Sequence, residues 1–306
     1  MKFHIARLSF VSSAQRILQK PEFEGTPIEL AEKLLVENEW YTPKKRGFVG
    51  LYFGDFISDM DGKLLAARLA KLKAKEVKIT KIDERKKGFR DRIDESYPTI
   101  YLLWDRDEQV IIVEKDMSIF PDYEVLFRSI EDHLNKLLVK YELRVSVVPL
   151  TERINFWRTI RKYVDGGYLY DVKFKLYMPN FFSKTQESLK ELKEALDAEK
   201  KDYNATESSR QISNPDGRLN IQENDKKTNA ALEWITKGGG EWSINDKKKV
   251  GKGKAINSTG NAKTVEISVK IENYTAEEAA KIISSLKPRY SIKSSREEND
   301  IEIENK

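Results

Sequence analysis

The chain has 306 residues, a formal net charge of +5, 34% charged residues and no cysteine. It can therefore hold no disulfide, thiolate zinc site or iron–sulfur cluster. No apolar run approaches the roughly 20 residues that cross a bilayer, so no membrane partner is expected. The first ten residues lack the apolar core of a signal peptide. We expect a soluble, cytoplasmic protein, and a length near twice the usual ~150 residues per domain predicts two domains.

The first half of the chain mixes strand and helix patterns. The helix expected at residues 62–74 rests on the spacing of four leucines between Leu64 and Leu72. Residues 99–113 have the pattern of a hairpin with a charged turn. We predict strands at residues 2–10, 48–53, 76–82, 99–104, 109–113 and 143–148, and helices at residues 27–38, 62–74 and 122–141.

The second half has weaker patterns and begins after Pro149. Thr151 is expected to cap a helix, residues 202–229 are expected to be mostly loop, and Thr275 begins a capping box. We predict helices at residues 151–163, 186–201, 227–236 and 275–287, and strands at residues 168–178, 219–221, 241–244 and 265–271.

Strands and helices mix without strict alternation, so we predict an α+β fold. It would have two mixed α/β domains with largely antiparallel sheets flanked by helices. The expected domains are residues 1–149 and 150–293, followed by an acidic tail, residues 294–306, that we expect to be disordered.

Positive charge is concentrated between Lys63 and Arg92, where twelve Lys and Arg residues accompany four acidic ones. We call this segment the basic stripe; such a stripe is typical of proteins with a polyphosphate partner. Its cations would occupy the outer face of the helix at 62–74 and a turn at 84–92. The predicted nucleic-acid contacts are Arg68, Lys71, Lys75, Lys78, Arg85, Lys86, Lys87, Arg90 and Arg92. The alternative is a solvated helix face with an exposed basic loop.

A second basic cluster lies between Lys237 and Lys263, where seven lysines accompany two acidic residues and several glycines. Glycine lets backbone amides approach an anion closely, and lysine supplies point charges. The Walker pattern is absent. The predicted contacts are Lys247, Lys248, Lys249, Lys252 and Lys254, and the alternative is a flexible hairpin tip.

Aromatic residues near the basic segments could stack on bases. Phe89 lies inside the basic stripe and Trp242 beside the second cluster. Trp40 and Tyr41 precede the cations of residues 44–46 and form a third small group. Aromatic residues in strands are more often part of the core.

Signals for catalysis are weak, since His4 and His133 are the only histidines. A metal-dependent nuclease would need Asp/Glu-x-Lys on a strand, with Mg²⁺ activating water. Glu76-Val-Lys78 and Asp171-Val-Lys173 have this form, but such triplets arise by chance in a charged chain. We therefore expect no catalytic residue, metal or other cofactor, and keep the nuclease as an alternative.

The order of several segments between about residues 45 and 245 is similar to that of a known family. The segments are the hairpin 99–113, the helix and strand 122–148, the strand ending at Met178-Pro179-Asn180, the turn Asn214-Pro-Asp-Gly217 and the segment Trp234–Trp242. Their order resembles that of phage-exclusion proteins of the RexA and KwaB kind. The resemblance implies an intracellular, two-domain, DNA-binding component of antiviral defence. It further implies a homodimer that acts with partner proteins of a defence system, and it carries no active-site residue across.

These patterns lead to the hypothesis of a cytoplasmic, non-catalytic protein that binds nucleic acid, DNA in the first place. A metal-dependent nuclease is one alternative. The other is a scaffold whose basic stripe meets an acidic protein.

Overall fold

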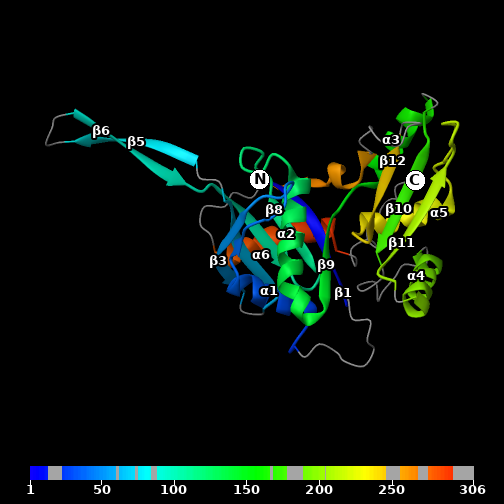
Figure 1. Cartoon of the computed structure of the whole chain (residues 1–306), viewed down its shortest axis with the longest axis horizontal. Coiled ribbons are helices and arrows are strands. Elements are labelled where there is room, and N and C mark those ends of the chain that lie inside the picture. The colour runs from blue at the N-terminus through cyan, green and yellow to red at the C-terminus, as the bar shows by residue number, and fades with distance from the viewer. Residues whose placement is uncertain are drawn as a thin grey trace, which may run out of the picture.

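The chain forms two antiparallel sheets and a separate two-stranded ribbon (Figure 1). The computed structural model describes residues 1–12, 23–59, 62–72, 75–83, 88–165, 168–177, 189–203, 205–245, 256–267 and 275–291, with the backbone alone for 75–83 and 88–96. The α+β fold expected from the sequence is confirmed.

The first sheet is built around the long strand β1, which pairs with β8, β9 and β14. Its strands are β1 (Lys2–Ser12), β2 (Trp40–Tyr41), β3 (Leu51–Ser58), β4 (Leu64–Lys71), β7 (Thr99–Asp105), β8 (Val110–Glu114), β9 (Leu143–Pro149) and β14 (Thr264–Glu266). Helices α1 (Pro27–Glu37) and α2 (Tyr123–Leu138) pack on one face, and η1 (Val139–Tyr141) follows α2. Helix α6 (Ala276–Leu286), with η4 (Lys287–Arg289) after it, packs on the other face.

The expected helix at residues 62–74 is wrong, because residues 64–71 form strand β4. Strand β4 lies between β3 and β7 and is buried on both faces, with Leu65 and Leu69 facing α1 and α2, and Ala66 facing α6. A strand buried on both faces loses the alternation of polar and apolar residues, so periodicity alone does not distinguish it from a buried helix.

The second sheet has the strand order β11-β10-β12-β13. Its strands are β10 (Asp171–Tyr177), β11 (Glu207–Ser213), β12 (Gly240–Asn245) and β13 (Ile256–Asn257), and η3 (Thr259–Asn261) follows. Helices α3 (Arg153–Asp165), α4 (Lys190–Tyr203) and α5 (Lys226–Thr236) pack on one face, where Phe174 and Trp242 are buried. The other face is polar and is turned toward α2 and β9 of the first sheet.

Three expectations for the second half are wrong. Residues 202–229 contain strand β11, whose residues are mostly exposed and polar and so lack a strand pattern. Residues 219–221 form no strand. Thr151 bridges to Ala262 instead of capping a helix, and α3 begins at Arg153.

The chain returns to the first sheet near its end. β14 pairs with β1, and α6 packs beneath β4 and β7, although the sequence placed both in the second domain. Buried Arg7 joins the segment after α6 to the turn between β7 and β8, because its guanidinium donates hydrogen bonds to the backbone oxygens of Glu108 and Tyr290. The division at residue 149 stays a prediction, and 294–306 lies outside the described residues.

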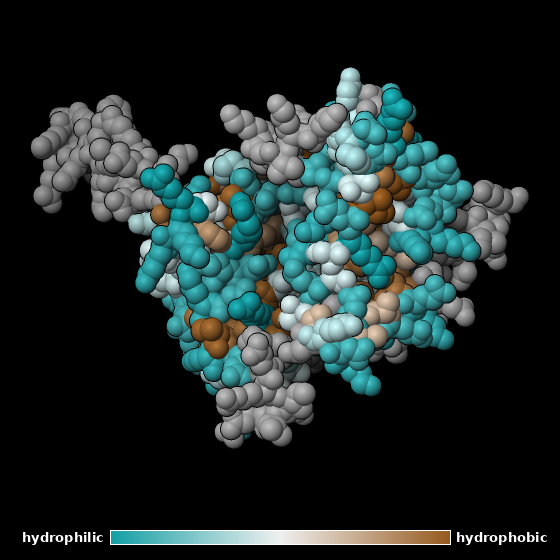
Figure 2. Space-filling view, turned by 45° about the vertical axis from the view of Figure 1, so that its right-hand side comes forward, coloured by the Kyte–Doolittle hydropathy of each residue, from teal (hydrophilic) through white to brown (hydrophobic). Residues whose placement is uncertain are grey.

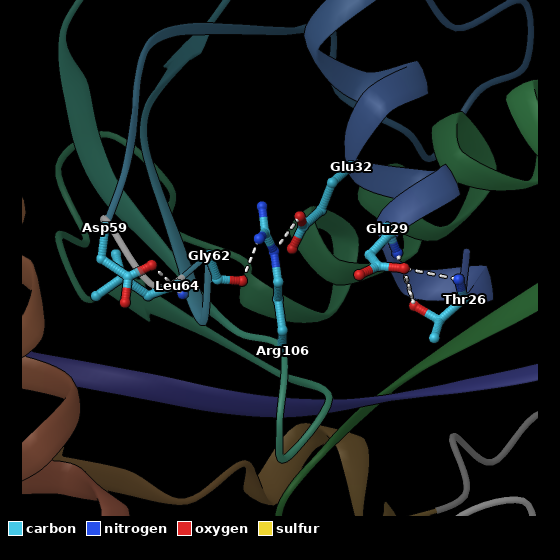
Figure 3. A network of polar contacts seen from close by, with 7 residues as sticks. All are labelled: Thr26, Glu29, Glu32, Asp59, Gly62, Leu64 and Arg106. Atoms are coloured by element: carbon cyan, nitrogen blue, oxygen red, sulfur yellow. Dashed lines mark hydrogen bonds and ion pairs between the residues drawn. The ribbon is translucent and has the colours of Figure 1, made fainter. Parts of the chain in front are cut away.

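A buried ion pair joins α1 to two loops of the first sheet (Figure 3). Arg106 Nε donates to Glu32 Oε2 at 2.5 Å, and the same guanidinium also donates to the carbonyl oxygen of Gly62. Glu32 Oε1 is buried without a hydrogen-bond donor among the described residues. Burial raises the pKa of Glu32 to about 7 although Arg106 opposes the shift.

Within the described ranges, none of the helices has both the length and the apolar character that crossing a bilayer requires.

We predict that ionisation of Glu32 lowers the stability of the fold. The folded pKa of about 7 exceeds the ordinary 4.5, so the folded state keeps a proton that the unfolded chain releases. The stabilisation is present below the unfolded pKa and is lost as the pH rises through the folded pKa. In urea unfolding this group should lower the free energy of unfolding by on the order of 2–3 kcal/mol between about pH 4.5 and pH 8.

Glu32→Gln should lack this component of the pH dependence. Glu37→Gln, an exposed position at the end of the same helix, should retain it. Equal pH profiles for Glu32→Gln and the unchanged chain would contradict the prediction.

Candidate nucleic-acid interface

The most prominent basic element is a ribbon of two strands, β5 (Lys75–Asp83) and β6 (Gly88–Ser96), which we call the arm. It is inserted between β4 and β7, which are neighbours in the first sheet, so both ends of the arm leave the body at one place. Figure 1 shows the arm (cyan) projecting from the body, away from the second sheet. At ~3.3 Å per residue, nine residues span about 30 Å.

The register separates charge between the two faces of the arm. Lys81 lies opposite Arg90, and Ile79 lies opposite Arg92. Paired residues of an antiparallel ribbon share a face, and the face alternates along each strand. One face therefore collects Lys75, Lys81, Arg90 and Arg92 with Asp83 and Asp94; we call it the cationic face. The other collects Lys78 with Glu76, Asp91 and Glu95.

The predicted nucleic-acid contacts of the basic stripe lie on different elements from those expected. Arg68 and Lys71 lie on β4, in the body, and not on a helix face. Residues 88–92, expected in a turn, begin strand β6. Lys75, Arg90 and Arg92 share the cationic face, and Lys78 falls on the opposite face. Arg85, Lys86 and Lys87 lie outside the described residues.

The described residues on either side of the second basic cluster do not lie near the arm. Lys247, Lys248, Lys249, Lys252 and Lys254 lie outside the described residues. Asn245 and Ile256, on either side of them, belong to β12 and β13 of the second sheet. Figure 1 places that sheet at the end of the molecule opposite the arm. The two clusters therefore begin from separate regions of the molecule.

The base of the arm holds a half-exposed arginine. Arg68 contacts Asp55 at 3.4 Å, and their side chains are 45% and 61% exposed. Asp55 follows Gly54 at an irregularity in the β3–β4 register and has a φ of 54°. Exposed pairs of this kind contribute little to stability.

The two carboxylate–lysine triplets do not form a common site. Asp171 and Lys173 lie on the polar face of β10, where Asp171 Oδ2 accepts a hydrogen bond from Asn245 at 2.8 Å and Lys173 is exposed. Glu76 and Lys78 lie on β5, of which the structure gives the backbone. Among the described residues no three His, Cys, Asp or Glu side chains gather as metal ligands would.

Sequence reasoning missed a polar cluster between the two sheets, beside a pocket of about 240 Å³. Lys175 on β10 contacts Glu207 at 2.8 Å and Glu241 at 3.7 Å, and the Tyr177 hydroxyl donates to Glu241 at 2.9 Å. Glu131 of α2 also lines this pocket. The signal was the alternation of polar residues from Asp171 to Tyr177.

Electrostatics favour the charged form of Lys175 and the protonated form of Tyr177. Burial opposes the charge of Lys175, but the hydrogen bond and charge of Glu207 dominate and raise its pKa. Burial raises the pKa of Glu131, and burial with the charge of Glu241 raises that of Tyr177. Tyr177 therefore stays protonated and donates to Glu241. The cluster can act as a polar joint between the sheets.

The joint also covers a strand edge. Val147 N on β9 donates to Glu131 Oε2 at 2.8 Å, and Val145 N donates to Asn135 Oδ1 at 2.9 Å. Glu131 and Asn135 lie one turn apart on α2, so both reach the same strand. Satisfying the outward amides of β9 blocks the pairing of another strand there.

Hydrophilic residues dominate the side of the molecule seen in Figure 2, and the hydrophobic residues form small separate patches.

Comparisons with protein-family models and with curated proteins find no match for this chain. The resemblance to phage-exclusion proteins therefore stays a prediction.

We predict that Lys175 stabilises the contact between the sheets. Lys175→Met removes a cation that Glu207 and Glu241 share and should lower the free energy of unfolding by on the order of 1–3 kcal/mol near neutral pH. The loss should shrink in acid, where the carboxylates are protonated. Lys173→Met, two residues away on the same face but exposed, should change stability by less than about 0.5 kcal/mol. Equal effects of the two substitutions would contradict the role of Lys175.

Proposed function

We propose that the chain binds nucleic acid, DNA in the first place, through the arm and without catalysing a reaction. The observation that carries the proposal is the register of the arm, which brings four cations to one face of a free-standing ribbon. A two-stranded ribbon fits the major groove of DNA, and its Lys and Arg residues neutralise phosphates.

The shape of the arm favours this proposal over a purely structural role. Two-stranded hairpins are at best marginally stable alone in water. The arm extends from the body with its two strands paired to each other (Figure 1). A segment that adds little to a core and carries concentrated charge is suited to meeting a partner.

We propose a cytoplasmic location, consistent with the nucleic-acid partner. A role in antiviral defence, a homodimer and defence-system partner proteins rest on the family resemblance alone and stay predictions. So does the nuclease alternative, which Mg²⁺-dependent cleavage of DNA or RNA, lost in Asp171→Ala or Glu76→Ala, would support.

We predict that removing cations from the arm weakens binding in a salt-dependent way. The variant Lys81→Ala/Arg90→Ala/Arg92→Ala removes three charges from the cationic face. Affinity for a labelled duplex, measured by fluorescence anisotropy between about 50 and 200 mM salt, should fall at least about tenfold at the low end. The slope of log K against log salt should become shallower by about 2 to 3.

A triple variant elsewhere controls for net charge. Lys190, Lys201 and Lys227 are exposed lysines of α4 and α5, and their replacement by Ala removes the same charge. It should leave affinity within about twofold, since binding contacts are local. Equal losses in both triple variants would overturn the arm as the binding element. If the unchanged chain bound poly-glutamate as tightly as a nucleic acid of equal charge, an acidic protein partner would be favoured instead.

A further inference from the structure

An exposed tryptophan lies beside the base of the arm. Trp40 on β2 is 63% exposed, whereas the other four tryptophans, Trp104, Trp157, Trp234 and Trp242, are at most 5% exposed. Burying Trp40 in a core would be the ordinary outcome for so large an apolar side chain. Its exposure leaves the indole ring accessible to a ligand.

Trp40 belongs to an ordered aromatic pair. It lies opposite Tyr52 of β3, with ring centroids 4.5 Å apart and a tilt of 45°. A Cβ on Gly54 would lie 2.9 Å from the Tyr52 ring, so glycine makes room for that ring above β3. A pair fixed in this way offers a preformed surface to a flat ligand.

Arg68 flanks the pair, together with the carboxylates of Glu39 and Asp55. Tyr52 lies opposite Ala70, and Gly54 lies opposite Arg68, so Trp40, Tyr52 and Arg68 share one face of the sheet. We call these three residues the platform. The exposed cations of residues 44–46 follow β2 in the sequence, but Lys45 lines a pocket with Asp132 and Lys136 of α2, on the other face of the sheet. An arginine beside an aromatic pair suits a flat ligand that carries a phosphate group.

The platform is continuous with the base of the arm. Ala70, in line with Trp40 and Tyr52, also lies opposite Thr99 of β7, and the arm begins a few residues beyond both. At ~4.8 Å per strand, Trp40 is about 10 Å from β4. Helix α6 packs on the same face farther along, over Ala66 and Leu103, and leaves Trp40 exposed.

We propose that the platform stacks unpaired bases of the nucleic acid that the arm holds, so that the preferred ligand is single-stranded or contains a single-stranded segment. The inference rests on the proposed function and names its substrate class. Bases inside a duplex are stacked on one another, whereas an unpaired base can lie on an aromatic ring. Arg68 then neutralises a neighbouring phosphate.

The test uses the accessibility of Trp40, since it is the exposed tryptophan and dominates quenching of the intrinsic fluorescence by acrylamide. A single-stranded oligonucleotide of about 12 residues, at saturation, should remove most of the quenching. A duplex of equal charge should leave it largely unchanged. Equal protection by the duplex or by poly-glutamate would overturn the inference.

Affinity provides an independent readout. Trp40→Ala should weaken single-strand binding about tenfold and duplex binding by less than about twofold, and Trp40→Phe should restore part of the loss. Tyr203→Ala, at an exposed aromatic residue of α4, should change neither. Equal losses for both ligands would indicate a structural role for Trp40.

The two proposals fail differently. Suppose that the triple variant of the arm binds more weakly, but that Trp40 of the unchanged chain remains accessible to acrylamide when a single strand is bound. The stacking proposal is then wrong, and the proposal that the arm binds nucleic acid is kept. If no nucleic acid binds the unchanged chain, both are wrong.

Discussion

The pairing of β4 with β7 is the constraint on which the exposed features of this molecule depend. The two strands run side by side from Leu64 opposite Asp105 to Ala70 opposite Thr99, and each is covered by helices on both faces. A strand buried on both faces has a strongly specified register, because a shift by one residue would exchange its two faces. The core thereby fixes the place from which the arm leaves, and it fixes Arg68 and the platform beside that place.

Other polar contacts fix the positions of helices and loops around strands β4 and β7. The Glu32–Arg106 pair ties α1 to the loop before β4 and to the turn after β7. Arg7 ties Tyr290, which follows α6 and η4, to the same turn, so α6 stays under β4 and β7. On the far side, Lys175 and its carboxylates join the second sheet to α2 and β9. These buried or half-buried groups serve the architecture, whereas Trp40 and Arg68, beside the base of the arm, are exposed.

Much of the fold could be predicted from the sequence where one face of an element is solvated. The apolar stripe of α2 and the capping threonine of α6 are such cases. The hairpin of β7 and β8 is buried on both faces and was recognised by its charged turn. The predictions failed where that contrast is missing. β4 is apolar on both faces, and β11 is exposed on both, with residues such as Ser208 and Arg210 that carry no strand pattern.

The sequence predicted which residue types make up the candidate site, but not how their side chains are arranged in space. The charge count located the arm, but only the register shows that Lys81, Arg90 and Arg92 share a face while Lys78 does not. Trp40 was noted beside basic residues, yet its pairing with Tyr52 and its alignment with Arg68 depend on strands distant in the sequence. The cluster around Lys175 needs two sheets and a helix to assemble, which no local pattern encodes.

Removal of the arm tests the central claim most directly. Because β4 and β7 are adjacent and antiparallel, residues 73–96 can be replaced by an Asn-Gly turn that joins them. Binding to nucleic acid at low salt should be lost in this variant, while its urea unfolding midpoint stays close to that of the unchanged chain. Full affinity with an unchanged salt dependence in the armless chain would contradict the account.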